Sequence, residues 1–245
     1  MVNDEQQANS GHTDAAAPAE AAGGHATETP ELTTWGVGAW EGDWPEGADQ
    51  PGSVYDTELL TNGDTRNVLD HYRYWSMEAI VADLDAQRHK YHVAIENWQH
   101  DLNIGSIVRT ANAFLAAEVH IIGNRRWNRR GAMVTDRYQH VRHHPTVEDF
   151  VAWTRTCGLG KDGGPLPIIG IDNVPGCQKI EEFDLPEACV LLFGQEGPGL
   201  SEQALEASDA ILEITQFGST RSINASAAAA ITMHCWIEQH VFKRR

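Results

Sequence analysis

The chain has 245 residues, 41% of them hydrophobic, which is enough for one large domain or for one domain with appendages. It contains no run of about 18 apolar residues, and its polar, acidic N-terminus has neither the basic nor the apolar region of a secretory signal. Its four cysteines are scattered without a Cys-x-x-Cys pair, which argues against a zinc ribbon or a disulfide framework. We therefore expect a cytoplasmic protein with reduced thiols and no membrane segment.

The net charge of −17 is distributed unevenly along the chain. Residues 1–64 contain 13 Asp and Glu and no Lys or Arg, whereas the remaining residues contain 22 acids and 18 bases. A uniformly acidic protein would repel nucleic acid, but a nearly neutral body with an acidic tail need not. The net charge therefore does not exclude RNA as a partner.

The first 64 residues are predicted to form a disordered acidic tail. Residues 1–34 have almost no large aliphatic side chains, so they cannot bury enough apolar surface to offset their ordering entropy. Residues 35–64 differ, because three tryptophans and a tyrosine lie there among Gly, Pro and acids. An alternative for this part is a strap that docks on the body or imitates nucleic acid.

Residues 65–90 are predicted to form an N-terminal helical extension. Apolar side chains recur at helical spacing from about residue 67 to residue 88, and Asp70 is a candidate N-cap. The extension precedes the main domain, and we expect it to cover one face of that domain.

Residues 91–245 alternate predicted strands with predicted helices. The strands are expected at 91–97, 119–122, 166–172, 188–193 and 210–214, and the main helices at 103–115, 146–159 and 224–242. Uninterrupted apolar strands in this alternation indicate an α/β fold, with a mainly parallel sheet covered by helices on both faces. In such sheets ligands bind beyond the carboxyl ends of the strands.

Two glycine- and serine-containing loops lie at that edge. The first, GQEGPGLS at 194–201, lacks both the GK[ST] ending of a P-loop and the G-x-G-x-x-G dinucleotide pattern. Its Glu196 either caps local backbone N–H groups or belongs to a ligand site. In the second loop, TRSINAS at 220–226, Ser222 and Asn224 are either ordinary helix caps or side chains that fix a ribose or phosphate.

Arg109 lies beside the apolar face of the helix for which Asn103 is the expected N-cap. One interpretation is a structural ion pair with Glu96 or Asp101. The other is bidentate binding of a phosphate, for which a guanidinium is well shaped.

The segment from residue 124 to residue 144 is strongly basic and also contains Trp127 and Tyr138. It is either a solvated loop or a set of phosphate contacts and stacking platforms for RNA. The candidate RNA-binding side chains are Arg125, Arg126, Arg129, Arg130, Arg137 and Arg142. His140, His143 and His144 are not accompanied by a Cys or carboxylate ligand set, so we predict no metal.

Three segments together resemble one family. NIGSIVRTANAF, LLFGQEGPGLS and SINASAAAAI match, in order and spacing, the three motifs of the SpoU family of RNA 2′-O-ribose methyltransferases in the SPOUT superfamily. The resemblance covers about residues 91–241. It implies an α/β fold with a deep trefoil knot at the C-terminal side, a homodimer with the active site near the dimer interface, and S-adenosylmethionine bound in the knot.

Carried over by position, the resemblance implies that Arg109 is the catalytic arginine, activating the ribose hydroxyl together with an RNA phosphate. Asn103 and Glu196 are implied to support it, and Ser222 and Asn224 form the polar pair of the third motif. The implied cofactor contacts are Gly194, Ile214, Ile223, Ile171 and Gln216.

The third motif departs from the family pattern before its loop and, more mildly, at Ile223, where the family core reads SLN. The family usually has Ile-Pro before this loop, whereas this chain has Thr215 and so lacks the fixed φ of proline. We expect a methyltransferase that acts on tRNA or rRNA. The alternative is a non-catalytic RNA-binding or ribosome-assembly protein with the same fold, and the altered loop is its only support.

Overall fold

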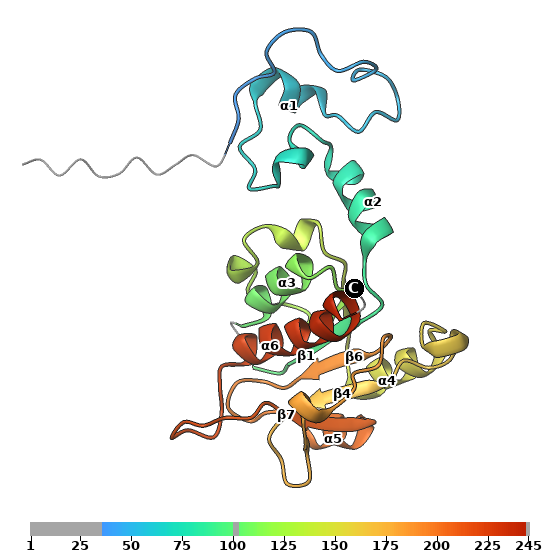
Figure 1. Ribbon diagram of the computed structural model, residues 1–245, viewed down its shortest axis with the longest axis vertical. Coiled ribbons are helices and arrows are strands. Elements are labelled where there is room, and N and C mark those ends of the chain that lie inside the picture. Colours follow the sequence, from blue (N-terminus) through green and yellow to red (C-terminus); the bar gives the residue numbers. More distant parts are fainter. Residues whose placement is uncertain (1–35, 100–102, 244–245) are drawn as a thin grey trace, which may run out of the picture.

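The structure is a computed structural model that describes residues 36–99 and 103–243 (Figure 1). The strands are β1 His92–Asn97, β2 Val119–Gly123, β3 Val141–His144, β4 Ile168–Ile171, β5 Gln178–Lys179, β6 Val190–Phe193 and β7 Ala210–Glu213. They form one seven-stranded sheet in the order β3-β2-β1-β6-β4-β7-β5, and every neighbouring pair is parallel. The predicted α/β fold is confirmed.

The register of the sheet brings the carboxyl ends of the central strands to one edge. Phe193 on β6 lies level with Ile95 on β1 and with Ile171 on β4. Ile171 in turn lies level with Leu212 on β7. The loops that follow β4, β6 and β7 therefore leave the sheet side by side.

Helices cover both faces of the sheet (Figure 1). Helices α3 (Asn103–Ala113) and α6 (Ala225–Ile237) pack against each other on one face, while α4 (Val147–Thr156) and α5 (Glu202–Ala207) lie on the other. Alternate residues of β6 divide between the two cores, with Leu191 in the first and Leu192 in the second. No helix in the described part of the chain is long and apolar enough to cross a membrane.

Some elements differ from their sequence-based prediction. Strand β3 lies inside the basic segment, where VRHH shows no apolar alternation, and it forms by pairing with β2. The two-residue β5 pairs only with β7. The last helix is shorter than the predicted range to residue 242, because α6 ends at Ile237 and a wider helical turn, Glu238–Phe242, follows. The trefoil knot implied by the resemblance stays a prediction, because strand order and register do not define the threading.

Residues 36–87, which we call the N-terminal module, contain ordered structure. The predicted disorder of residues 1–64 is therefore wrong for residues 36–64, and residues 1–35 lie outside the described residues. Helix α1 (Thr57–Asn62) begins where the Asp56 side chain accepts hydrogen bonds from two backbone N–H groups. Backbone hydrogen bonds also join Val37 to Asp64 in both directions, at 2.9 and 3.0 Å.

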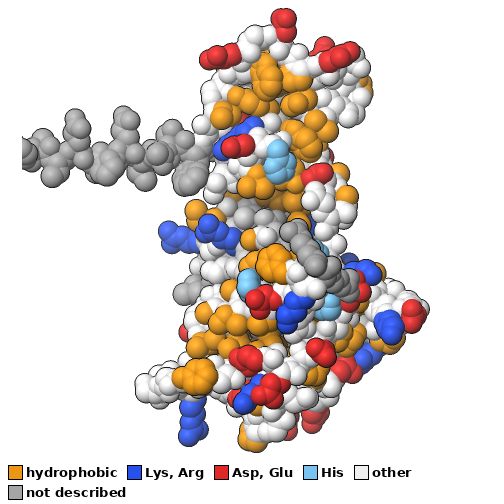
Figure 2. Space-filling model, in the orientation of Figure 1, with side chains coloured by type: hydrophobic (Ala, Val, Ile, Leu, Met, Phe, Trp, Pro, Cys, Tyr) orange, Lys and Arg blue, Asp and Glu red, His pale blue; other side chains and the backbone are white. Residues whose placement is uncertain are grey.

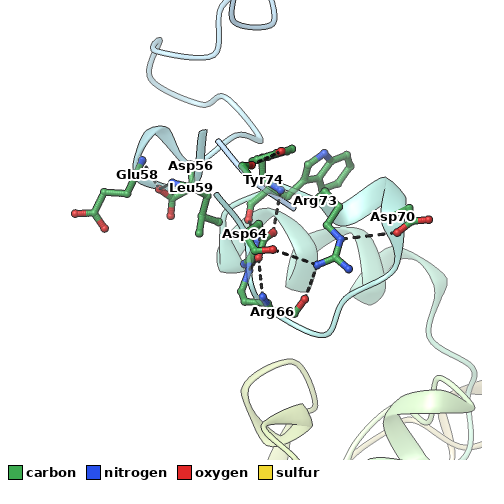
Figure 3. Close-up of polar contacts among 10 residues, drawn as sticks. Asp56, Glu58, Leu59, Asp64, Arg66, Asp70, Arg73 and Tyr74 are labelled. Carbon is green, nitrogen blue, oxygen red and sulfur yellow. Dashed lines mark hydrogen bonds and ion pairs between the residues drawn. The ribbon is translucent and has the colours of Figure 1, made fainter. Parts of the chain in front are cut away.

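A buried carboxylate holds the module together (Figure 3). Asp64 accepts hydrogen bonds from Arg66 Nε at 2.9 Å, Arg66 Nη2 at 2.7 Å and the Tyr74 N–H at 3.0 Å. Burial raises the pKa of Asp64, but these hydrogen bonds outweigh burial and hold the pKa below its ordinary value. Trp40 packs edge-on against Tyr55 and Tyr74. Trp40 and Tyr55, which the sequence placed in a tail, thus pack with Tyr74 in a small folded unit.

The predicted helix over residues 67–88 is interrupted. A 3-10 turn at Asp70–Tyr72 precedes Tyr74, whose φ of 63° breaks the helical path. Helix α2 (Met77–Gln87) starts only after its N-cap, Ser76. Figure 1 places the module at one end of the molecule, away from the sheet, and not over a sheet face as expected.

The module is anchored to the body just beyond the end of α2. Arg88 donates hydrogen bonds of 2.6 Å to the Tyr138 carbonyl and 2.8 Å to Gln139 Oε1. Asp85 pairs with His140 at 2.8 Å. These contacts fix the module beside the basic segment.

Candidate functional site

A cavity of about 500 Å³ lies at the carboxyl ends of β4, β6 and β7. All five residues that the resemblance implied for the cofactor line it: Ile171, Gly194, Ile214, Gln216 and Ile223. Glu196, Ser222 and Asn224 also line it. The two loops singled out in the sequence therefore form one concave site, because the parallel register brings their strands to the same edge.

Three polar side chains from the three motifs meet at this site. Asn103 Nδ2 donates a 2.6 Å hydrogen bond to Glu196 Oε2, and Asn224 Nδ2 donates one of 2.9 Å to Asn103 Oδ1. Asn224 Nδ2 also lies 3.4 Å from each Glu196 carboxylate oxygen. The cluster joins α3, the loop after β6 and the start of α6.

Asn224 is the helix cap that the sequence offered as one of two roles, and its side chain also contacts the other two motif residues. Its Oδ1 accepts hydrogen bonds from the N–H groups of Ser226 and Ala227, at 2.9 and 3.3 Å, so it is the N-cap of α6. Its amide nitrogen is then directed to Asn103 and Glu196. The Ser222 side chain is exposed and forms no hydrogen bond with a described residue, so Ser222 lines the cavity without joining the cluster.

Arg109 is exposed on α3, within two turns of Asn103. The suggested ion pair with Glu96 is not formed, because Glu96 accepts hydrogen bonds from Trp98 Nε1 at 2.9 Å and the Ser201 N–H at 2.7 Å. Asp101, the other suggested partner, lies outside the described residues. Asn103, the expected cap of this helix, is the first residue that α3 itself contains.

The glycine loop after β6 is closed tightly on itself. Gln195 and Gly199 exchange backbone hydrogen bonds of 3.0 Å in both directions. A Cβ on Gly194 would lie 2.0 Å from the Gly199 carbonyl carbon, so no other residue fits without moving the loop. Gly199 itself has a φ of +75°. These glycines shape the wall of the cavity in which the cofactor is predicted to bind.

Sequence reasoning missed two carboxylates that hold this loop. Asp172 Oδ2 accepts the Leu200 N–H at 2.8 Å, and Glu96 accepts the Ser201 N–H. Each is a single acid at or just after the carboxyl end of a buried strand, and this position was the available sequence signal. Gln195 contributes as well, because its Oε1 accepts the Trp98 N–H at 3.0 Å.

The departure at Thr215 has its own structural partner. The Thr215 N–H, which a proline would lack, donates to Glu181 Oε1 at 3.1 Å, and Thr215 Oγ1 lies 3.0 Å from Glu181 Oε2. Burial raises the pKa of Glu181, but hydrogen bonds from its own backbone N–H and from Thr215 outweigh burial and lower it. A side chain thus restrains the backbone where the family usually has a fixed φ.

The basic segment packs over the start of α3. A Cβ on Gly105 would lie 2.8 Å from the Ala132 nitrogen, so the two backbones are in close contact. Figure 2 shows Lys and Arg side chains projecting from the body at this level. The exposed arginines of the segment before β3 are Arg125, Arg126, Arg129, Arg130 and Arg137.

Arg129 and Arg142, both among the predicted RNA-binding arginines, are paired with acids. The Arg129 guanidinium lies 5.5 Å from the Trp127 ring and 3.3 Å from Asp136, while its side chain stays 73% exposed. Arg142 is placed apart from the others, on β3, where Nε lies 3.0 Å from Glu118 and the guanidinium lies over Trp153.

The three histidines of the basic segment are not brought together. His140 pairs with Asp85, His143 Nε2 lies 2.7 Å from the Gly123 carbonyl, and His144 turns inward. The buried His144 side chain is one of three histidines in a row. Ring nitrogens of His120 lie 3.0 Å from a ring nitrogen of His144 and 3.0 Å from a ring nitrogen of His92.

Among the described residues, one group has ligand atoms close enough for a metal: His92, Glu118 and His120. The positive charge of Arg142, paired with Glu118, opposes a cation there.

Comparisons with known proteins identify relatives of this chain. Residues 90–234 match the model of the SpoU rRNA methylase family. An uncharacterised tRNA/rRNA methyltransferase of Mycolicibacterium smegmatis is 33% identical over 141 residues, which are 58% of this chain and 44% of that protein. The tRNA (guanosine(18)-2′-O)-methyltransferase of Escherichia coli K12 is 28% identical over 145 residues, covering 58% of this chain and 60% of the relative.

Solved structures share the fold. One is the SpoU methyltransferase AviRb of Streptomyces viridochromogenes, solved in complex with AdoMet. Its TM-score is 0.56 at 24% identity, and the matched region covers 63% of this chain and 59% of the AviRb chain. The A. aeolicus TrmH/SpoU tRNA-modifying enzyme has a TM-score of 0.58 at 20% identity, and the matched region covers 69% of this chain and 86% of that enzyme's chain. Since the family model spans more than half of the 245 residues, including all three motif segments, the chain belongs to the SpoU rRNA methylase family.

Proposed function

We propose that the protein transfers a methyl group from S-adenosylmethionine to a ribose 2′-hydroxyl of tRNA or rRNA in the cytoplasm. The observation that carries the proposal is the meeting of Asn103, Glu196 and Asn224 at the edge of the cavity. Membership of the family and the E. coli relative's printed 2′-O activity support it. The chain spans less than half of its mycobacterial relative, so the activity is argued from this site.

The cavity suits S-adenosylmethionine. Its volume of about 500 Å³ lies within the range of small-molecule sites. Its described lining includes the carboxylates Asp172, Glu196 and Glu213 and contains no Lys, Arg or His. This acidic lining is complementary to a cationic sulfonium. We propose that the glycine loop at Gly194 and the backbone at Ile214 and Ile223 hold the cofactor, with Ile171 and Gln216 beside it.

When bound, S-adenosylmethionine supplies an electrophilic methyl group whose sulfur leaves without an acid. The chain must then orient the hydroxyl and help to remove its proton. Arginine stays protonated in proteins, so Arg109 alone is a poor base. We propose that Arg109 binds an RNA phosphate bidentately and that Arg109 and this phosphate together activate the hydroxyl. Asn103 and Asn224 orient Glu196 beside the site, and Ser222 faces the ribose.

We also propose a homodimer with α6 in the interface. Ala227, Ile231 and His234 form an exposed stripe at the i, i+4, i+7 spacing of one helix face, and Ile231 is 41% exposed. Phe242, just beyond the helix, is 55% exposed. A second copy would bury this stripe close to the start of α6, where the site lies. Sedimentation at micromolar concentration tests the assembly.

The test of the proposed reaction is Arg109→Ala. We expect loss of methyl transfer to bulk tRNA or rRNA, while calorimetry shows unchanged S-adenosylmethionine binding. Arg155→Ala is the matched control, because Arg155 is an exposed arginine on α4, on the other face of the sheet. Wild-type turnover in Arg109→Ala would overturn the assigned role, and product without a 2′-O-methyl ribose would overturn the reaction.

The non-catalytic alternative rested on the altered third motif. The contacts between Thr215 and Glu181 restrain that loop in place of proline, which supports an intact cavity over the alternative. Absence of S-adenosylmethionine binding in calorimetry would favour the alternative.

A further inference from the structure

The segment between β7 and α6 exposes an aromatic ring to solvent. The Phe217 side chain is 94% exposed, the highest value among the exposed large hydrophobic residues of the described chain. Figure 1 shows this segment projecting from the body, and Figure 2 shows hydrophobic and basic side chains standing out there. A ring at this exposure is accessible to a partner from outside the chain.

The base of the segment is held in place while its tip is free. Asn173 Nδ2 donates a short hydrogen bond to the Arg221 carbonyl, and Gln216 Nε2 lies 3.4 Å from the same oxygen. A Cβ on Gly218, next to Phe217, would meet nothing within 4 Å. The tip is therefore presented on a fixed base beside the cavity, which Gln216 lines.

A positive charge accompanies the ring. Arg221 is exposed, and its guanidinium has no hydrogen bond or ion pair with a described residue. Ser222, the adjacent residue, lines the cavity, and Asn224 belongs to the polar cluster. An aromatic ring and a free arginine on one segment are the two groups that bind single-stranded RNA, the ring by stacking and the arginine by phosphate contact.

We propose that Phe217 stacks on an unpaired RNA base next to the target nucleotide while Arg221 contacts the adjoining phosphate. The inference rests on the proposed function, since it takes the ribose to lie between this segment and Arg109. It makes Phe217 a positioning residue that favours unpaired RNA, because a base within a duplex already stacks on its neighbours. Two other occupants of the ring, the dimer partner and the bound cofactor, are outcomes of the test.

The experiment compares Phe217→Ala, Phe217→Leu and Phe217→Tyr. Binding of the full-length protein to bulk tRNA and to single-stranded poly(A) is measured by fluorescence anisotropy. Loss of one stacked base should weaken binding by about 5- to 150-fold in the Ala variant. Leu keeps an apolar side chain but has no ring, so it should resemble Ala, whereas Tyr should resemble the wild type. Leu159→Ala, which removes another exposed aliphatic side chain, is the control and should bind normally.

The salt dependence separates the two residues. Arg221→Ala should lower the slope of log K against log salt by about 0.7, the value for one lost single-strand phosphate contact. Phe217→Ala should leave that slope unchanged. Wild-type RNA affinity in either Phe217→Ala or Phe217→Leu overturns the stacking role.

Two further readouts identify the other occupants. Dissociation of the Phe217→Ala dimer in sedimentation, or weaker S-adenosylmethionine binding in calorimetry, would assign the ring to the interface or to the cofactor and overturn the proposal. The readouts here are binding constants, so they stand apart from the reaction. A wild-type protein that binds RNA through Phe217 without methylating it would contradict the proposed function alone.

Discussion

The side-chain amide of Asn103 donates a 2.6 Å hydrogen bond to the carboxylate of Glu196, across 93 positions of sequence. This contact joins the first residue of α3 to the glycine loop after β6. Asn224 completes the cluster from the N-cap of α6. The position of Glu196 is thus fixed by two amides, at the starts of two separate helices. A small shift of either helix would therefore move the Glu196 carboxylate in the cavity.

Exchanging the amide and the carboxylate between positions 103 and 196 distinguishes the contribution of this contact to stability from its contribution to methyl transfer. Asn103→Asp places two carboxylates together and Glu196→Gln removes the charged acceptor. A hydrogen bond to a charged group contributes about 1.5–3 kcal/mol, so we expect each single variant to lose stability on that scale, together with methyl transfer. In the double variant the introduced amide at position 196 can donate to the introduced carboxylate at position 103, which restores the bond in the opposite sense.

Urea unfolding and methyl transfer measure the two effects. We expect the double variant to recover stability but not activity if the carboxylate is needed at position 196. Recovery of both would mean that only the contact matters, and recovery of neither would contradict the pairing.

Much of the site was accessible from sequence because the motifs mark strand ends. The alternation of apolar strands and helices indicated a parallel sheet, and in such a sheet the loops carrying Gly194 and Ser222 must emerge at one edge. The contacts inside the site were not accessible. Nothing local tells that Glu196 meets Asn103 rather than its own loop, since the meeting depends on how α3 and α6 pack.

The N-terminal module shows the reverse case. Its acidic, glycine-rich composition is typical of disorder, and the prediction failed for residues 36–64 because a few contacts decide the outcome. The Asp64 carboxylate accepts four hydrogen bonds from Arg66 and Tyr74, and Trp40 packs against Tyr55 and Tyr74. Composition averages over a segment and therefore misses one well-placed carboxylate.

Restoring the family's proline should impair this protein. Thr215→Pro removes both the N–H and the hydroxyl that contact Glu181. Partly exposed hydrogen bonds to a carboxylate contribute about 1–2 kcal/mol, so we expect S-adenosylmethionine affinity about 5- to 30-fold weaker by calorimetry. Glu181→Gln should cost less, and adding it to Thr215→Pro should cost nothing further. Tighter cofactor binding in Thr215→Pro would show that Glu181 does not replace the proline.

The buried histidine chain should make the protein sensitive to acid. Burial, with a smaller contribution from Arg142, lowers the pKa of both His92 and His144 from 6.5 to about 4. Between pH 6.5 and pH 4 the unfolded chain binds these protons and the folded chain does not. Stability contributed by the pair is therefore complete above pH 6.5 and is lost as the pH falls toward 4, by at most about 3 kcal/mol per histidine.

The variant that tests this is His144→Gln. The Gln side chain places a polar group where Nε2 of His144 meets His120 but does not titrate. The free energy of unfolding in urea should fall less steeply for the variant than for the wild type between pH 6.5 and pH 4.5. Parallel curves would show that His144 is not kept neutral in the fold.

Neutralising acids of the N-terminal module should strengthen RNA binding at low salt. Glu41, Asp43, Glu46 and Asp49 are exposed on a module that is anchored next to the arginines of the basic segment. Their charges repel RNA phosphates over about 30 Å at 10 mM salt but only about 8 Å at 150 mM. Replacing all four by Gln or Asn should tighten poly(A) binding by about fivefold at 10 mM salt, and the gain should vanish at 150 mM.

Position, and not only net charge, decides this effect. A second variant in which the exposed acids Glu148, Asp162, Glu202 and Glu206 are replaced in the same way changes the net charge equally. These residues lie on α4, on α5 and in the turn after α4, remote from the module's anchor on the basic segment. The control should gain clearly less than the module variant. Equal gains in RNA affinity would mean that the module acts only through the total charge of the protein. No gain in either variant would mean that the bound RNA lies too far from both sets of acids for their charges to repel it. A larger gain from the module variant would mean that this folded acidic unit lies close enough to the bound RNA to repel it at low salt.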